Sequence, residues 1–123
     1  MSSKVVIRKN GGFMCVYGND AYILYYLLGY KIKDDKVGFP NSAYNKVINI
    51  LEDNHISYEY AEVLVDYKKK NNYDRFVKLG KKKFSLDYRV NDIISKLDKL
   101  AEKDIDKILN YVESFYEWKF FSC

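Results

Sequence analysis

The chain has few of the residues on which most catalytic and metal sites depend. Its 123 residues include one histidine, one proline and two cysteines. A structural zinc site needs about four ligands, whereas Cys15 and Cys123 lie near opposite ends of the sequence and far from His55. We therefore expect no metal site and no cofactor.

Motifs of the common enzyme classes are also missing. The sequence contains no G-x-x-x-x-G-K-[ST] loop for nucleotide phosphates and no G-x-S-x-G nucleophile turn. His55, next to Asn54, has no nucleophile or acid at a spacing that would make it a general base. The paired carboxylates Asp34 and Asp35 fall in a predicted turn, where such residues usually face solvent. We expect a protein that is not an enzyme.

No apolar run is long enough to cross a bilayer. The longest, residues 21–28, falls far short of the roughly 20 residues that a membrane-spanning helix needs. The composition is rich in lysine, and the first residues show no signal-peptide pattern. We expect a soluble, cytoplasmic protein in which both cysteines stay reduced.

Positive charge, by contrast, is concentrated in one segment. Residues 66–83 contain eight basic and two acidic residues, a net charge of +6, whereas the rest of the chain contains thirteen basic and fifteen acidic residues, a net charge of −2. Such a cluster is either a solvated surface or a footprint for nucleic-acid phosphates. With eighteen lysines and three arginines in the chain, phosphate contacts are favoured over reading of base edges. The candidate contacts are Lys68, Lys69, Lys70, Arg75, Lys78, Lys81, Lys82 and Lys83.

The spacing of apolar and turn residues predicts alternating strands and helices in the first half of the chain. Asn10-Gly11 is a strong hairpin signal, Asn19 or Asp20 can cap a helix, and Gly29 can end it. In chain order the predicted elements are strands over 4–8 and 13–17, a helix up to residue 28, extended pieces over 30–33 and 36–38, a helix after Pro40 that ends at Asn54, and a strand over 56–65.

The second half is predicted to be helical. Residues 66–90 are expected to be a helix-and-loop region, and residues 91–118 have a helical apolar period that forms one long helix or two, with a break near 101–103. The aromatic end either packs on the core or covers a partner or a second copy. Its residues are Phe115, Tyr116, Trp118, Phe120 and Phe121. The whole predicts one domain over 1–123 with an α+β or mixed α/β architecture.

One stretch of the first half resembles a known family. Residues 11–21, Gly-Gly-Phe-Met-Cys-Val-Tyr-Gly-Asn-Asp-Ala, resemble the G-D-F-Y-E-L-F-x-x-D-A segment that begins the mismatch-recognition domain of MutS DNA mismatch-repair proteins. A second block, residues 37–43 continuing to Ala61-Glu62, is similar to the family's C-G-V-P-x-H-A…L…L…C-E run. The resemblance covers roughly residues 4–65. It implies an α+β fold with a small mixed sheet flanked by helices, which agrees with the pattern of predicted elements.

The resemblance implies a role for Phe13. This residue matches the family's phenylalanine that wedges into the minor groove and stacks on a mispaired base, a contact that kinks the duplex. Met14 and Cys15 replace the family's tyrosine and glutamate, and a thiol carries no acceptor comparable to a carboxylate. Without the family context, a phenylalanine that begins a strand is also a common core residue. The length of the chain and the missing phosphate loop exclude a complete repair enzyme.

Two functions remain open on the sequence alone. In the first, the chain is a standalone, non-catalytic module that binds nucleic acid, with duplex DNA favoured over RNA or single strands. Phe13, Met14 and Cys15 then meet the bases while the lysines of residues 66–83 contact phosphates. In the second, the chain is a protein-interaction adaptor or inhibitor from a mobile element that acts on nucleic-acid machinery. Its aromatic end is then the interface.

Overall fold

The computed structural model describes residues 3–121, and side chains for residues 3–119. It divides the chain into two compact units, Met1–Leu86 and Asp87–Cys123, which we call the sheet unit and the helical unit. The fold is α+β, as the sequence predicts. That residues 1–123 form a single domain stays a prediction.

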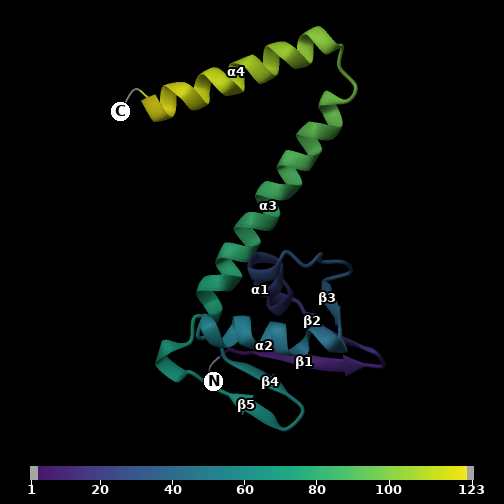
Figure 1. Cartoon of the computed structure of the whole chain (residues 1–123), viewed down its shortest axis with the longest axis vertical. Helices are drawn as coiled ribbons and strands as arrows, with labels where there is room; N and C mark the ends of the chain where they lie inside the picture. Colours follow the sequence, from purple (N-terminus) through teal and green to yellow (C-terminus); the bar gives the residue numbers. More distant parts are fainter. Residues whose placement is uncertain (1–2, 122–123) are drawn as a thin grey trace. The chain divides into compact units, whose positions relative to one another are not determined.

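The sheet unit is built on a five-stranded mixed sheet with the strand order β3-β2-β1-β4-β5 (Figure 1). The pairing of β1 with β4 is parallel and the other pairings are antiparallel. The strands are β1 (Val5–Asn10), β2 (Phe13–Tyr17), β3 (Lys36–Pro40), β4 (Tyr58–Tyr60) and β5 (Val63–Val65). The helical segments are α1 (Asn19–Leu28), η1 (Asn41–Ala43), α2 (Tyr44–Asp53), η2 (Lys68–Lys70), α3 (Tyr73–Leu97) and α4 (Glu102–Phe121).

The predicted hairpin of β1 and β2 is confirmed. Asn10 pairs with Phe13, so Gly11 and Gly12 form the two-residue turn. Gly11 has a φ of 61°, a conformation that glycine adopts without the steric cost of a Cβ atom. The side of the hairpin away from β1 is held by the chain that follows β3, where the Asn41 amide N–H donates to the Gly12 carbonyl at 3.1 Å.

The helix after β2 begins and ends where expected, but its predicted cap is different. Helix α1 starts at Asn19 after Gly18, with no side-chain capping bond, and it ends at Gly29, whose φ is 71°. The Asp20 carboxylate instead accepts the amide N–H of Val6 in β1 at 3.0 Å and the hydroxyl of Tyr73 in α3. One half-buried carboxylate therefore ties together three elements.

This carboxylate lies in an apolar setting that changes its acidity. Burial raises the pKa of Asp20 above its ordinary value, and the hydrogen bonds from Tyr73 and Val6 counteract that rise in part. The pKa of Tyr73 is also raised, by burial and by the hydrogen bond to Asp20. The pair is a structural link of the sheet unit.

Three further predictions are corrected by the structure. Residues 56–65 form the two strands β4 and β5 around a turn at 61–62, and not one strand. The extended piece over 30–33 is reduced to a single bridge between Lys33 and Lys36, around the predicted turn at Asp34-Asp35. The helix predicted to begin at residue 91 begins at Tyr73, within the basic segment. Of the two alternatives for residues 91–118, one helix or two, the structure has two, α3 and α4, separated at 98–101.

The core of the sheet unit lies on one face of the sheet. Alternate residues of the strands, such as Ile7, Val16 and Phe39, pack there against α1, α2 and the first turns of α3 (Figure 1). Helices α1 and α3 cross closely at Gly80, where an added Cβ atom would lie 2.2 Å from the carbonyl oxygen of Tyr22. A glycine is therefore required at that crossing.

The helical unit, unlike the sheet unit, has no buried core among its described side chains. No side chain described for residues 87–119 is buried. Neither α3 nor α4, nor any other helix of residues 3–121, combines the length and apolar character that crossing a membrane requires.

Candidate nucleic-acid interface

One face of the sheet is left uncovered by the helices. In β2, Met14 and Val16 point into the core, so the alternation of a strand directs Phe13, Cys15 and Tyr17 to the opposite face. Directly paired residues of neighbouring strands share a face, which extends this surface onto β1 and β3. We call it the open sheet face, and its central residues are Arg8, Asn10, Phe13, Cys15, Tyr17, Lys36 and Pro40.

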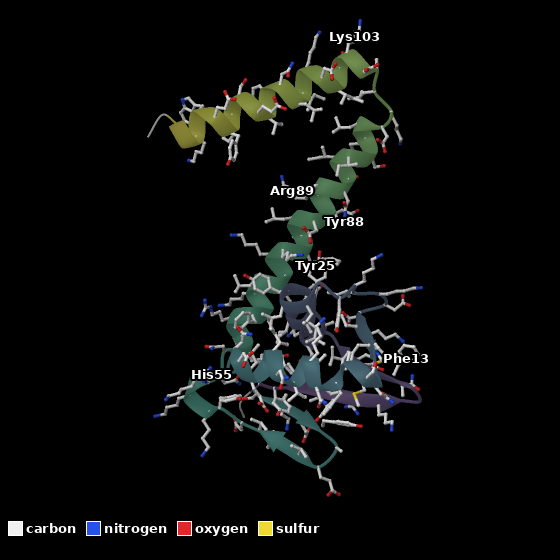
Figure 2. All side chains as sticks on the ribbon, in the orientation of Figure 1. Phe13, Tyr25, His55, Tyr88, Arg89 and Lys103 are labelled. Atoms are coloured by element: carbon white, nitrogen blue, oxygen red, sulfur yellow. The ribbon has the colours of Figure 1, made fainter. Side chains whose placement is uncertain are left out.

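Phe13 is the most prominent residue of this face. It begins β2 directly after the glycine turn, and 58% of its surface is exposed. Its strand partners are Asn10 on one side and Pro40 on the other, neither of which covers it. Figure 2 shows the ring at the hairpin end of the sheet unit. Of the two alternatives for this residue, the exposed position is the one observed.

Met14 and Cys15 do not have the positions predicted for base contacts. Met14 is buried in the core beneath the sheet, with 6% of its surface exposed. Cys15 is on the open sheet face but is also only 6% exposed, because it lies between Phe13 and Tyr17 along the strand and between Arg8 and Gly38 across it. Neither side chain is available to a nucleic acid, and the prediction is wrong for both.

A second aromatic and two cations complete the open sheet face. Tyr17 is 45% exposed and lies four residues from Phe13 on the same strand, or about 14 Å along it. Arg8 pairs with Cys15 and therefore stands between the two rings in the register, and Lys36 pairs with Tyr17. The rings supply π faces for bases and the cations supply charge for phosphates.

A hollow adjoins this face where β4 leaves β1. Strand β1 pairs with β4 only over Val5–Ile7. From Arg8 onward, the edge of β1 that faces away from β2 therefore has no strand beside it in the described structure. The resulting cavity, of about 460 Å³, is lined by residues of β1, β4 and the turn after β4: Val6, Ile7, Arg8, Lys9, Glu59, Tyr60 and Ala61. Two cations next to the hairpin thus border an accessible polar hollow.

The lysines of the basic segment are not beside Phe13. The segment's 3-10 turn, η2, adjoins the beginning of β1, because the Asn71 side chain donates to the Ser3 carbonyl at 2.6 Å. Phe13 lies past the other end of β1, about 17 Å away along a strand of six residues. Figure 2 shows the same separation, with Phe13 and His55 at opposite ends of the sheet, and His55 contacts Tyr67 next to η2. The structure therefore separates the predicted wedge from Lys68, Lys69 and Lys70.

The other basic residues of the segment belong to α3. Lys81 and Lys83 lie over the rings of Tyr22 and Tyr25 in α1, with the ammonium nitrogens 5.8 and 4.4 Å from the ring centroids. The guanidinium of Arg75 lies 5.6 Å from the ring of Phe76 in its own helix. These contacts hold part of the positive charge against the helical layer of the sheet unit. Lys78 and Lys82 are exposed on the same helix.

The aromatic residues predicted as an interface lie in α4. Phe115, Tyr116 and Trp118 are 55%, 59% and 64% exposed, so they are not buried within the helical unit. The rings of Phe115 and Trp118 lie 6.1 Å apart. The side chains of Phe120 and Phe121 fall outside those that the structure describes.

Sequence reasoning did not select Arg8, Tyr17 or Lys36. The signal for Arg8 and Tyr17 was present, since period-two alternation places 13, 15 and 17 on one face and the hairpin register places residue 8 opposite 15. Lys36 needs the pairing of β3 with β2, which the sequence alone does not give.

Comparisons of the chain with protein-family models, with curated proteins and with solved structures found no match.

Proposed function

We propose that this protein is a non-catalytic nucleic-acid-binding module that contacts duplex DNA through the open sheet face, with Phe13 as the inserting side chain. The observation that carries the proposal is the exposure of Phe13: a phenylalanine 58% exposed at the tip of a hairpin, on a face that no described helix covers. Exposing so large an apolar ring to water is unfavourable unless a partner covers it.

The surroundings of the ring suit this partner. Arg8 lies on the same face, and Lys9 lines the adjoining hollow. The turn Gly11-Gly12 carries no side chain, so a sugar-phosphate backbone can approach the hairpin closely. An aromatic side chain inserted between base steps gains stacking energy, and the cost of unstacking is lower at a mismatch. The resemblance of residues 11–21 to the MutS recognition segment supports the same role for Phe13.

The proposal differs from the sequence-based hypothesis in the source of the phosphate contacts. Arg8 and Lys36, which lie on the open sheet face, replace the lysines of residues 66–83 as the nearest cations, because the latter begin about 17 Å away along β1. Two phosphate contacts correspond to a slope of roughly −2 in a plot of log affinity against log salt on duplex DNA.

Fluorescence anisotropy with four labelled ligands tests the function. Homoduplex DNA, duplex DNA with a single mismatch, single-stranded DNA and RNA are each titrated with the full chain at several salt concentrations. We expect the tightest binding to the mismatched duplex, with micromolar or lower Kd at low salt and a slope of about −2. Absence of binding to all four ligands at low salt would contradict the proposal.

The variant Phe13→Ala identifies the inserting residue. Loss of one aromatic stacking contact corresponds to about 1–3 kcal/mol, so affinity for the mismatched duplex should fall roughly 5- to 150-fold. Folding should be unaffected, because the ring is mostly exposed. Tyr88→Ala is the matched control, since Tyr88 is a 69% exposed aromatic in the helical unit. Equal affinities for the two variants would show that Phe13 has no special role.

A further inference from the structure

The helical unit exposes a continuous series of apolar side chains. Among the side chains described for residues 87–119, large apolar groups such as Val90, Ile93 and Val112 are more than half exposed. A helix in a monomeric protein normally covers its apolar face with a core, and these positions have none. Nothing within the described helical unit covers them.

Their spacing is that of helices which pack side by side. In α3, Val90, Ile93 and Leu97 follow one another at intervals of three and four residues. In α4 the same alternation connects Ile105, Ile108, Val112 and Phe115. Intervals of three and four are the a and d positions of a heptad repeat, whose side chains interlock with those of a facing helix.

The apolar face of α4 is wider than one facing helix would cover. Next to the a and d positions, Leu109 and Tyr116 occupy e positions, and Tyr111 and Trp118 occupy g positions. All four are exposed, Tyr111 to 74%. A helix that is apolar at a, d, e and g is covered by helices on two sides, as in a bundle, and a single pair of helices leaves part of it in water.

We propose that a second copy of this chain covers this face, so that the helical units of two copies form a shared helical bundle. Eleven exposed apolar side chains of residues 90–118 lie on or beside the heptad positions. At about 100 Å² each they offer roughly 1,000 Å² per copy, against the roughly 800 Å² per partner of a stable interface. The inference is independent of nucleic-acid binding.

The charges of the helical unit favour a like partner over a polyanion. Residues 87–119 contain six basic and eight acidic residues, a net charge of −2 with both signs interspersed. An anionic membrane surface or a nucleic acid would select a basic helix, and this one is slightly acidic. Two copies, in contrast, repel one another only weakly and meet through identical surfaces related by a two-fold axis.

Light scattering coupled to gel filtration tests the association on the full chain. Interfaces of this size associate between micromolar and lower concentrations, so injections from about 1 to about 100 µM cover the range. We expect a mass of twice the 14.6 kDa of one chain at the upper end. A mass of one chain throughout the range would overturn the proposal.

Paired substitutions on α4 locate the interface. Val112→Glu places a charge at an a position, within the proposed core, and should weaken association at least tenfold. Asn110→Glu adds the same charge to the opposite side of the helix and should leave the mass unchanged. Because both positions are exposed, neither substitution disturbs the core of the sheet unit, which far-ultraviolet circular dichroism can verify. A Val112→Glu variant that dimerises like the parent overturns the proposal.

Trp118 reports the same event independently. It is the single tryptophan of the chain and is 64% exposed. On association its emission should shift to shorter wavelength and its quenching by acrylamide should fall, over the same concentrations at which the mass doubles. In a parallel sample at 1 µM, phosphatidylcholine–phosphatidylserine vesicles should leave the emission unchanged. A shift that requires vesicles, with a monomeric mass at every concentration, would assign the face to lipid and contradict the proposal.

Discussion

At the scale of single residues, position in the register decides what each side chain can do. Phe13, Met14 and Cys15 are neighbours in sequence, and the sequence hypothesis treated them as one contact group. In the structure the first is exposed, the second is buried in the core and the third is covered by its neighbours on the open sheet face. Successive side chains of a strand point to opposite faces of the sheet, so residues that are adjacent in a sequence motif need not contact the same partner.

Asp20 gives a prediction at this scale. Its pKa is raised in the folded state, mainly by burial, so the folded protein binds the proton more readily than the unfolded chain. Stability from this source is fully present below the unfolded pKa of about 4 and is lost as pH rises through the folded pKa. The variant Asp20→Asn lacks this titration. As the pH falls from 7 to 3, the unfolding free energy of the parent should therefore rise relative to that of Asp20→Asn.

Urea unfolding of both proteins at intervals across that range measures the difference, and it cancels the contributions of all other titrating groups. A difference that moves in favour of Asp20→Asn as the pH falls would mean that the hydrogen bonds from Tyr73 and Val6 outweigh burial.

At the scale of elements, the sequence predicted a structure wherever a local signal existed. The β1–β2 hairpin has its glycine turn, and α1 has Gly29 at its end, where the chain adopts the left-handed conformation. The turn between β4 and β5 has neither glycine nor asparagine. Ala61 adopts a φ of 54° there, so the sequence gives no warning of the turn and the two strands were predicted as one.

One residue makes the start of α3 difficult to predict from the sequence. Its buried positions are Tyr73, Phe76, Val77 and Gly80, at the intervals of three and four that mark a helical face. Glycine at the fourth position breaks the apolar pattern and lowers helix propensity, so the sequence predicts a helix-and-loop region over 66–90 without bounds for the helix. The close crossing with α1 requires that glycine.

The crossing makes a second prediction. In Gly80→Ala the new methyl group would lie 2.2 Å from the Tyr22 carbonyl oxygen, so α1 and α3 must move apart. We expect a loss of about 1–3 kcal/mol in unfolding free energy, despite the higher helix propensity of alanine. Chemical denaturation measures it. Gly12→Ala is the control, since no heavy atom lies within 4 Å of the added Cβ and its φ is not positive, and it should change stability by less than about 0.5 kcal/mol. Equal losses in both variants would show that the crossing is not tight.

At the scale of the whole molecule, charge and aromatic surface are separated in a way that composition does not reveal. The sequence located the positive charge correctly, but the lysines of η2 lie at the opposite end of β1 from Phe13. The exposed apolar residues of the helical unit were predicted correctly as helical, while packing on the core and contact with a partner were both left open. No local pattern distinguishes these alternatives, because both require an amphipathic helix.

Charge reversal tests this separation. Arg8→Glu alters the open sheet face and should weaken DNA binding at least tenfold, because it would remove the proposed phosphate contact and add repulsion. Lys69→Glu makes the same change in η2, about 17 Å from Phe13 along β1 and beyond the Debye length of about 8 Å at physiological salt. Its effect in the same anisotropy assay should stay within about threefold. A larger loss for Lys69→Glu than for Arg8→Glu would place the DNA on the basic segment.

The central claim is that nucleic acid meets the open sheet face at Phe13, and nuclear magnetic resonance tests it most directly. In a titration of isotope-labelled full chain with the mismatched duplex, the backbone amides of Arg8, Gly12, Phe13 and Tyr17 should shift first and most. The ring signals of Phe13 should shift with them. Shifts confined to the amides of residues 68–83, with Phe13 unchanged at saturation, would contradict the account.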